Sequence, residues 1–350
     1  MCEVRGEEVS NKRERELWID IAKAMGIGLV MAGHTGLPIY LRSWIYLFHM
    51  PMFFFISGLW IREDSTFIKN IQRKFKAYII PYFGYSIILS ILKFLVDFNI
   101  DNIVKDVYMT ITGHGSFSIL WFLFALFWTD ILYNGLFHIL NKNKKIVCLC
   151  SLLMAVCASI SNYYKIPNTL LWQSIFESLF FYSLGGVLKE KLKGKMKAIN
   201  NNIVLIVVSI FAVIMTYLIS FYSLRITNKH LDLANGYLGL PAVGLCGAII
   251  GILFILSLSR LVDLYFPHYL KYPLYLVGAN TIIFFPLVEF IPFYIDLIFP
   301  MAFDGIIMSL ILKVIGIWIC FVIVFIKNRV TINNSKRKIA STCSKSSDVR

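Results

Sequence analysis

Long apolar stretches separated by short polar connections dominate the chain between residues 18 and 326. A helix that crosses a bilayer needs about 20 mostly apolar residues, and ten stretches meet this requirement. They cover roughly residues 18 to 38, 43 to 61, 77 to 96, 117 to 138, 146 to 161, 169 to 188, 203 to 222, 237 to 258, 272 to 294 and 306 to 326. The fifth is short, and Pro286 and Pro292 interrupt the ninth. The pattern predicts an all-α fold, a polytopic membrane helical bundle of about ten transmembrane helices.

Polar segments flank this region on both sides. We expect residues 1–17 to form a cytoplasmic N-terminal segment, residues 18–326 the transmembrane domain, and residues 327–350 a basic, disordered cytoplasmic tail. The first span carries Asp20 and Lys23 and is not followed by a small-residue cleavage site, so no cleaved signal peptide is expected. The connections are short and no internal repeat is visible, which indicates one domain.

Lysine and arginine gather in every second connection between the predicted spans. The connections on the side of the two termini hold 26 of the 34 lysines and arginines, whereas the intervening connections hold five. Because positive residues concentrate in cytoplasmic loops, both termini are predicted to be cytoplasmic, in a protein of the inner (plasma) membrane. Topology therefore accounts for most of the net charge of +14, and we expect no nucleic-acid partner.

The composition agrees with a membrane protein. Hydrophobic residues make up 58% of the chain and charged residues 15%, against roughly 25% charged residues in soluble domains. Glycine and proline are at ordinary levels, which excludes collagen-like and disordered classes. Most of the seven cysteines lie scattered in apolar runs, as small core residues do, and this spacing argues against a zinc or disulfide framework.

The first span holds the densest set of ionisable residues, and such residues inside a bilayer are functional candidates because they are costly to bury. Lys23 and His34 are eleven residues apart, which places them about 20° apart on one helical face and about 16 Å apart along it. Asp20 joins this face, where it can pair with Lys23. Lys23 could instead extend to the inner headgroups, whereas His34 lies too far toward the outer half to do so.

A second histidine follows in the next span. Because the chain now runs inward, His49 lies at a depth close to that of His34, so the two imidazoles can meet across adjacent helices. A neutral imidazole is the usual general base at neutral pH, but two core histidines bonded to backbone carbonyls fit the same pattern. Two histidines without a nearby carboxylate make a poor metal set, and the chain has no Gly-x-Ser-x-Gly motif. We therefore expect neither a metal nor a serine nucleophile.

Two runs in these spans carry a family pattern: Trp18 to Lys23 leading to Gly33-His34, and Phe48 to Gly58. They resemble the acyltransferase-3 family of integral membrane O-acyltransferases, and the start of the first run resembles its fucose 4-O-acetylase-like branch. Further similar segments are Arg73 to Lys76 with Pro81-Tyr82, Trp121 to Leu126, and Phe180 to Gly186. The resemblance is strong over residues 17 to 130 and looser after that.

The chain departs from the family pattern in two places. Many members carry arginine eleven residues before the first-span histidine, whereas Lys23 keeps the charge but loses the bidentate fork. Near the C-terminal end the family often shows a Gly-x-Asn-Ser segment and a late histidine. Here Gly278-Ala279-Asn280-Thr281 leads to Glu289 without a histidine, which leaves the role of the ninth span open.

The resemblance implies transfer of an acyl group, usually acetyl from acetyl-CoA, to a sugar hydroxyl of a cell-surface glycan or its lipid-linked precursor. Such chemistry needs a base for the hydroxyl proton and a cation or hydrogen-bond donor for the oxyanion. We expect His34 to be the general base and His49 to support it through hydrogen bonding. Lys23 is expected to hold the donor's pyrophosphate or to orient its thioester.

The cytoplasmic connection after the second span is the expected contact for the phosphates of CoA. Arg73, Lys74 and Lys76 supply its charges, together with Lys23, and Trp121 could line the donor channel. Plain positive-inside topology or contact with lipid headgroups explains the same basic residues. Trp121 could likewise serve packing or anchor the chain at the membrane interface.

Two carboxylates in later spans leave alternatives open. Asp130 and Glu177 either orient a histidine or contact the sugar, or they are buried structural partners. A transporter or flippase for a lipid-linked glycan could also use intramembrane lysine, aspartate and histidine as a coupling relay. That class tends to show internal repeats and paired broken helices, which the sequence lacks. A sensor or scaffold without catalysis is a third class.

Overall fold

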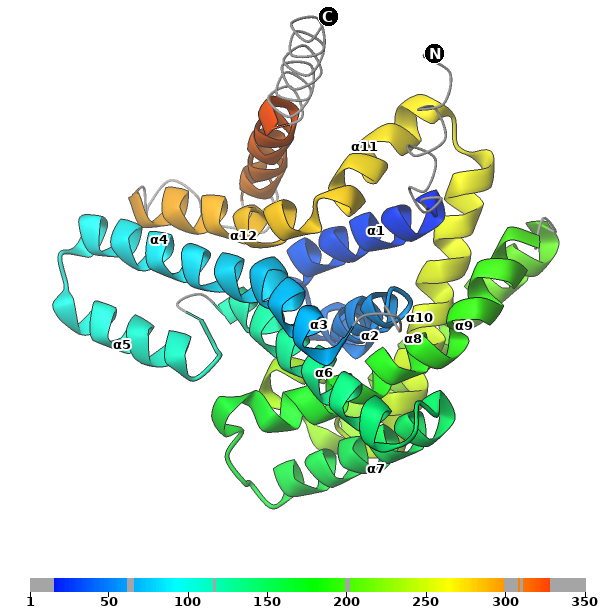
Figure 1. Ribbon diagram of the computed structural model, residues 1–350. Helices are drawn as coiled ribbons and strands as arrows, with labels where there is room; N and C mark the ends of the chain where they lie inside the picture. Colours follow the sequence, from blue (N-terminus) through cyan, green and yellow to red (C-terminus); the bar gives the residue numbers. More distant parts are fainter. Residues whose placement is uncertain are drawn as a thin grey trace, which may run out of the picture.

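The computed structural model describes residues 16–61, 66–115, 118–198, 202–298, 308 and 311–327. Over these residues the chain is helical and contains no strand beyond one isolated bridge between Asp232 and Tyr237. The predicted all-α fold is thereby confirmed (Figure 1).

The first half of the chain forms six α-helices, one of which continues another through a π-helical turn. The elements are α1 (Leu17–Gly33), α2 (Ile39–Gly58), α3 (Phe67–Lys74), η1 (Phe75–Ile79), α4 (Ile80–Asp97), α5 (Ile100–Ile111), η2 (Ser118–Leu120) and α6 (Trp121–Ile139).

The second half adds six labelled α-helices and a last helix over residues 311–327. The labelled elements are α7 (Lys144–Tyr163), η3 (Thr169–Leu171), α8 (Trp172–Ala198), α9 (Asn202–Thr227), η4 (Leu233–Asn235), α10 (Pro241–Tyr265), α11 (His268–Ala279) and α12 (Thr281–Ile298).

Six helices among the described residues are long and apolar enough to cross a membrane. They are Ile39–Gly58, Phe67–Val96, Trp121–Ile139, Lys144–Tyr163, Ile203–Thr227 and Pro241–Tyr265. They coincide with the second to fifth, seventh and eighth predicted spans. The count of ten spans stays a prediction, because α1 has only 17 residues and α8 carries buried polar side chains such as Gln173 and Glu177. The orientation of the termini also stays a prediction.

The ninth predicted span is two helices, and its break lies at a different residue from the one expected. α11 ends at Ala279 and α12 begins at Thr281 and continues through Pro286 and Pro292, so the prediction of an interruption at these prolines is wrong. The Asn280 side chain donates to the Leu276 carbonyl at 3.0 Å, a local bond of the kind that competes with the helix.

α12 tolerates its first proline because another helix supplies a hydrogen bond. Pro286 has no N–H to donate to the carbonyl of Ile282, four residues earlier. The Tyr85 hydroxyl of α4 donates to that carbonyl at 3.2 Å. The early part of α12 is therefore tied to α4, beside which it lies in Figure 1.

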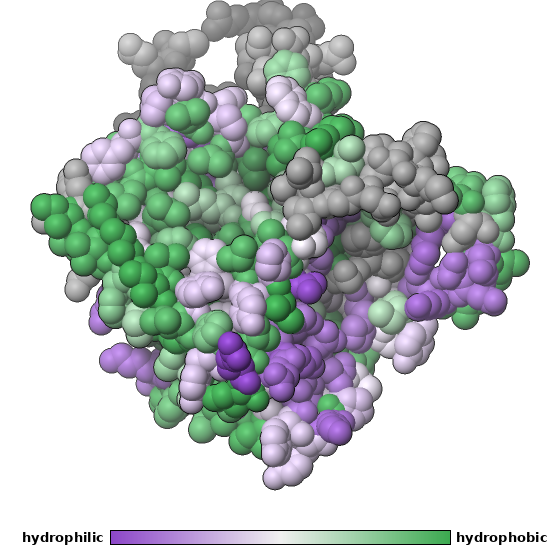
Figure 2. Space-filling view, turned by 180° about the vertical axis from the view of Figure 1, so that it is seen from behind, coloured by the Kyte–Doolittle hydropathy of each residue, from purple (hydrophilic) through white to green (hydrophobic). Residues whose placement is uncertain are grey.

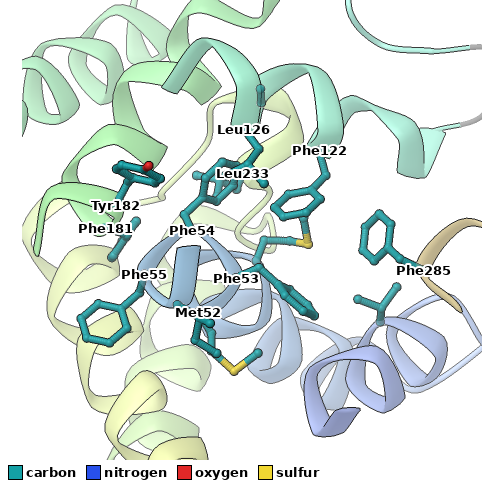
Figure 3. Packing of buried hydrophobic residues seen from close by; sticks show 14 of the residues in the cluster. Met52, Phe53, Phe54, Phe55, Phe122, Leu126, Phe181, Tyr182, Leu233 and Phe285 are labelled. Atoms are coloured by element: carbon teal, nitrogen blue, oxygen red, sulfur yellow. The ribbon is translucent and has the colours of Figure 1, made fainter. Parts of the chain in front are cut away.

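α2 lies at the centre of the bundle and packs against α1, α8, α9 and α10. Its run from Met52 to Phe55 is buried and meets aromatic side chains of α6 and α8, as Figure 3 shows. Burying an aromatic side chain removes roughly 150–250 Å² from solvent. Packing of this run is therefore a large part of what holds the central helices together.

Outer helices present apolar side chains on the surface. On α4, Ile87, Ile91 and Leu95 are each more than half exposed, and α9 shows the same for Val207 and Phe211. The view from behind is largely hydrophobic, with hydrophilic residues gathered over one part of it (Figure 2). Apolar surface of this extent is typical of contact with lipid, in agreement with the six candidate spans.

Two glycines let α2 and α8 approach closely. A Cβ atom added at Gly58 would lie 2.0 Å from the Tyr182 carbonyl oxygen, and one added at Gly185 would lie 2.1 Å from the Phe55 carbonyl oxygen. Neither obstacle is a flexible side chain that could move aside. Small residues at such crossings are common in membrane bundles because they allow backbone contact.

We expect Gly58→Ala to destabilise the protein by at least the 1–3 kcal/mol that is typical of overpacking, since the two backbones must separate. Gly84→Ala in α4 is the matched control, because a Cβ atom there meets nothing within 4 Å. Thermal denaturation in detergent measures the difference. Equal midpoints for the two variants would contradict the close crossing.

The topology has its own test. A reporter enzyme fused after residue 327 should be active only in the cytoplasm, because the side of the membrane that holds both termini carries 26 lysines and arginines against five on the other. Periplasmic activity of this fusion would show that the predicted orientation is wrong.

Candidate active site

Two cavities adjoin one another between α1, α2, α6 and α12. The first, which we call the lysine cavity, has a volume of about 200 Å³ and is lined in part by Lys23, Lys74 and Tyr78. The second, the histidine cavity, has a volume of about 170 Å³ and is lined in part by His34 and His49. Phe285 lines both. The structure thus brings the predicted histidines together and places the predicted cation Lys23 in the neighbouring space.

The histidines enter their cavity from consecutive helices. His34 is the first residue after α1, and its backbone N–H donates to the Val30 carbonyl at 3.2 Å. His49 lies inside α2 and is buried. The ring of Tyr46 contacts both, with centroid distances of 6.2 Å to His34 and 5.0 Å to His49.

A backbone hydrogen bond defines the tautomer of His49. Its Nδ1 lies 2.9 Å from the Ile45 carbonyl oxygen, and a carbonyl can only accept. Nδ1 therefore carries the proton, and Nε2 of the neutral ring keeps a free lone pair. His34 lines the same cavity but differs from the buried His49 in being exposed.

The lysine cavity contains two lysines whose charges are balanced by buried carboxylates. Lys23 Nζ donates to Asp20 Oδ1 at 3.0 Å, which confirms the predicted pair. Lys74 Nζ lies 2.7 Å from Asp130 Oδ1. Thr281, the first residue of α12, also lines this cavity, so a helix N-terminus with its partial positive charge borders the same space.

Asp130 connects three helices. Besides Lys74 it accepts hydrogen bonds from Asn70 of α3 at 2.8 Å, from Asn134 at 3.1 Å and from the Tyr182 hydroxyl of α8. These contacts favour the interpretation of Asp130 as a buried structural partner, one that also positions Lys74. Glu177 is likewise buried and accepts from Ser159 of α7 at 2.9 Å, which links α7 to α8.

The remaining predicted donor contacts lie elsewhere. Arg73 donates to the side chain of Asn70, and Lys76 is exposed within η1; neither lines the lysine cavity. Trp121 lines the histidine cavity, whereas the next residue, Phe122, lines the lysine cavity. Successive residues of a helix point in directions about 100° apart, so the first turn of α6 contributes to both.

The loop between α9 and α10 closes one side of the histidine cavity, a position that no pattern in the sequence predicts. Asp232 accepts from the Ala234 N–H at 3.1 Å and from the Asn235 side chain at 2.7 Å. This turn places Asp232 and Asn235 in the cavity lining. The ring of His230 packs edge-on against Tyr46 at 5.2 Å, and burial lowers the pKa of this imidazole below its usual range.

A further charged pair supports the end of α1. Lys313, in the last described helix, donates to Glu289 of α12 at 3.0 Å and to the Met31 carbonyl at 2.8 Å. All three groups are buried. The pair therefore joins two late helices to the last turn of α1, three residues before His34.

A family model described as an acyltransferase domain matches residues 16–325. The chain belongs to the acyltransferase-3 family. The match includes both cavities and every residue that lines them. Together with the apolar helices, it identifies a multi-pass membrane acyltransferase. Neither a curated protein nor a solved structure matches the chain, and membership of the fucose 4-O-acetylase-like branch stays a prediction.

Proposed function

We propose that this acyltransferase moves an acetyl group from cytoplasmic acetyl-CoA to a sugar hydroxyl of a cell-surface glycan or its lipid-linked precursor. The observation that carries the proposal is the direct adjacency of the lysine and histidine cavities. A transferase needs an anion-binding site for the donor next to a base for the acceptor hydroxyl, and these two spaces offer that combination.

On the donor side, Lys23 and Lys74 supply the positive charge. Each uses one of its three ammonium protons on a carboxylate and keeps others for phosphate or thioester oxygens. In the predicted topology Lys23 lies toward the cytoplasmic face, where acetyl-CoA is made. An extended pantetheine arm could span the roughly 16 Å of helix between Lys23 and His34.

On the acceptor side, an imidazole nitrogen of His34 takes the proton of the sugar hydroxyl. The hydroxyl oxygen then attacks the thioester carbonyl carbon and the new C–O bond forms. As the C–S bond breaks, the sulfur leaves as thiolate and receives the proton from the imidazolium of His34, which returns to its neutral form. A covalent acyl-histidine step is also compatible with these residues.

His49 and the loop residues provide the surroundings of this base. The free lone pair on His49 Nε2 can accept a hydrogen bond from the acceptor or from His34, while the bond to Ile45 holds its ring. Asp232 and Asn235 add polar groups to a wall that also includes the aromatic rings of Tyr46 and Trp121. A few polar groups among aromatic ones is the usual make-up of a small-molecule site.

Inside-out membrane vesicles test the function directly, because their cytoplasmic face is exposed to added acetyl-CoA and they carry the cell's own glycans. Radiolabelled acetyl should enter the extracted glycan only when the protein is present. A transporter, flippase or scaffold would incorporate no label, and that result would refute the proposal. Mass spectrometry of the labelled glycan identifies the acceptor sugar.

We expect His34→Ala to reduce acetyl transfer at least about a hundredfold, since general-base assistance is typically worth 10²–10⁴ in rate. His49→Ala should impair transfer through the lost hydrogen bond to the site. The matched control is His138→Ala, because His138 lies at the end of α6, is exposed and lines neither cavity. Near-normal transfer by His34→Ala at matched protein levels would remove this histidine from the mechanism.

Removal of the Lys74 charge should raise the apparent KM for acetyl-CoA about tenfold or more, because fewer positive charges then attract this polyanionic donor. Combining Lys74→Met with Asp130→Asn avoids leaving the buried carboxylate without its cation. Lys76→Met is the control, since it removes the same charge from an exposed position outside the cavity. If both variants keep the normal KM, these lysines serve topology and the donor binds elsewhere.

A further inference from the structure

Aromatic side chains line the region between the two cavities. Phe285 borders both spaces, while Phe53 and Phe122 border only the lysine cavity. The Phe285 ring lies 5.2 Å from Phe122 and 6.1 Å from Phe53 between centroids, and it is 4% exposed. Figure 3 shows these three rings converging from α2, α6 and α12.

The rings of Phe53 and Phe122, which flank Phe285, are held in place by their own neighbours. Phe53 lies directly on Gly26 of α1, where an added Cβ atom would come within 2.7 Å of the ring. Phe122 packs against Phe54 at 5.1 Å and Phe53 at 5.7 Å. Close-packed interiors leave little free space for such rings to move, so the flanking rings form a fixed frame for Phe285.

The turn of α12 that carries Phe285 is also fixed. Pro286 follows directly, and the carbonyl it leaves unbonded, that of Ile282, accepts from Tyr85 of α4. Phe285 therefore projects between the cavities from a backbone that two helices hold. The volume of its side chain sets the space left between the lysines and the histidines.

We infer that Phe285 limits the size of the acyl group, favouring acetyl over longer acyl chains, an inference that rests on the proposed function. The acyl carbon must come within bonding distance of the acceptor oxygen at His34 while its CoA remains at the lysines. The acyl tail then competes with the Phe285 ring for the same space. Each methylene that must be fitted into such a pocket changes selectivity by about 10–200-fold.

The test compares butyryl-CoA with acetyl-CoA as donors in the same inside-out vesicles. Phe285→Ala should raise the ratio of butyryl to acetyl incorporation at least about tenfold, and Phe285→Leu should give a smaller rise. This ratio is measured within one preparation, so it does not depend on how much protein is folded. If Phe285→Ala yields too little protein, the leucine variant provides the comparison.

Phe284→Ala is the matched control. Phe284 is the preceding residue of α12, is fully buried and packs at 5.3 Å against Phe321 of the last helix, but it lines neither cavity. Its loss should leave the ratio unchanged. An unchanged ratio in Phe285→Ala, or an equal rise in Phe284→Ala, would overturn the inference while the wild type still transfers acetyl. No acetyl transfer by the wild type would instead refute the proposed function.

Discussion

The pairing of buried charges is the constraint on which the bundle depends. A charge removed from water without a partner costs several kcal/mol. Three of the lysines that meet this cost by contact with a carboxylate lie around α1 and the cavities: Lys23 with Asp20, Lys74 with Asp130, and Lys313 with Glu289. The first pair is local to α1. The other two join different helices, so these ion pairs also link elements that lie around the cavities.

The paired charges also make the lysine cavity chemically different from the neighbouring histidine cavity. Lysines paired with carboxylates gather at the lysine cavity, whereas the histidine cavity holds imidazoles, one of which bonds a backbone carbonyl, together with the carboxylate of Asp232. Aromatic side chains line the region between them, where Phe285 borders both cavities. This division matches the anionic donor and the neutral hydroxyl acceptor of the proposed function.

Features set by spacing along one helix could be predicted from the sequence, and features set by packing could not. The Asp20–Lys23 pair follows from a three-residue separation, and the meeting of His34 with His49 follows from a short hairpin between consecutive helices. The partner of Asp130 could not be predicted from the sequence, because Lys74 lies 56 positions earlier on another helix. No pattern in the sequence singles out Asp232, and only the fold shows that its turn covers the histidine cavity.

The late helices show how a departure from the family pattern fits the structure. Residues 278–289 contain no histidine, although the family resemblance implies one near this end of the chain. Instead, α12 contributes a cavity wall through Phe285 and a buried carboxylate through Glu289. The break at Asn280 directs the start of α12 toward the lysine cavity. Lys313, which is paired with Glu289, also donates a hydrogen bond to the Met31 carbonyl of α1. In the proposed mechanism, proton transfer rests on His34, directly after α1, and on His49 of α2, while α12 shapes the space in which it takes place.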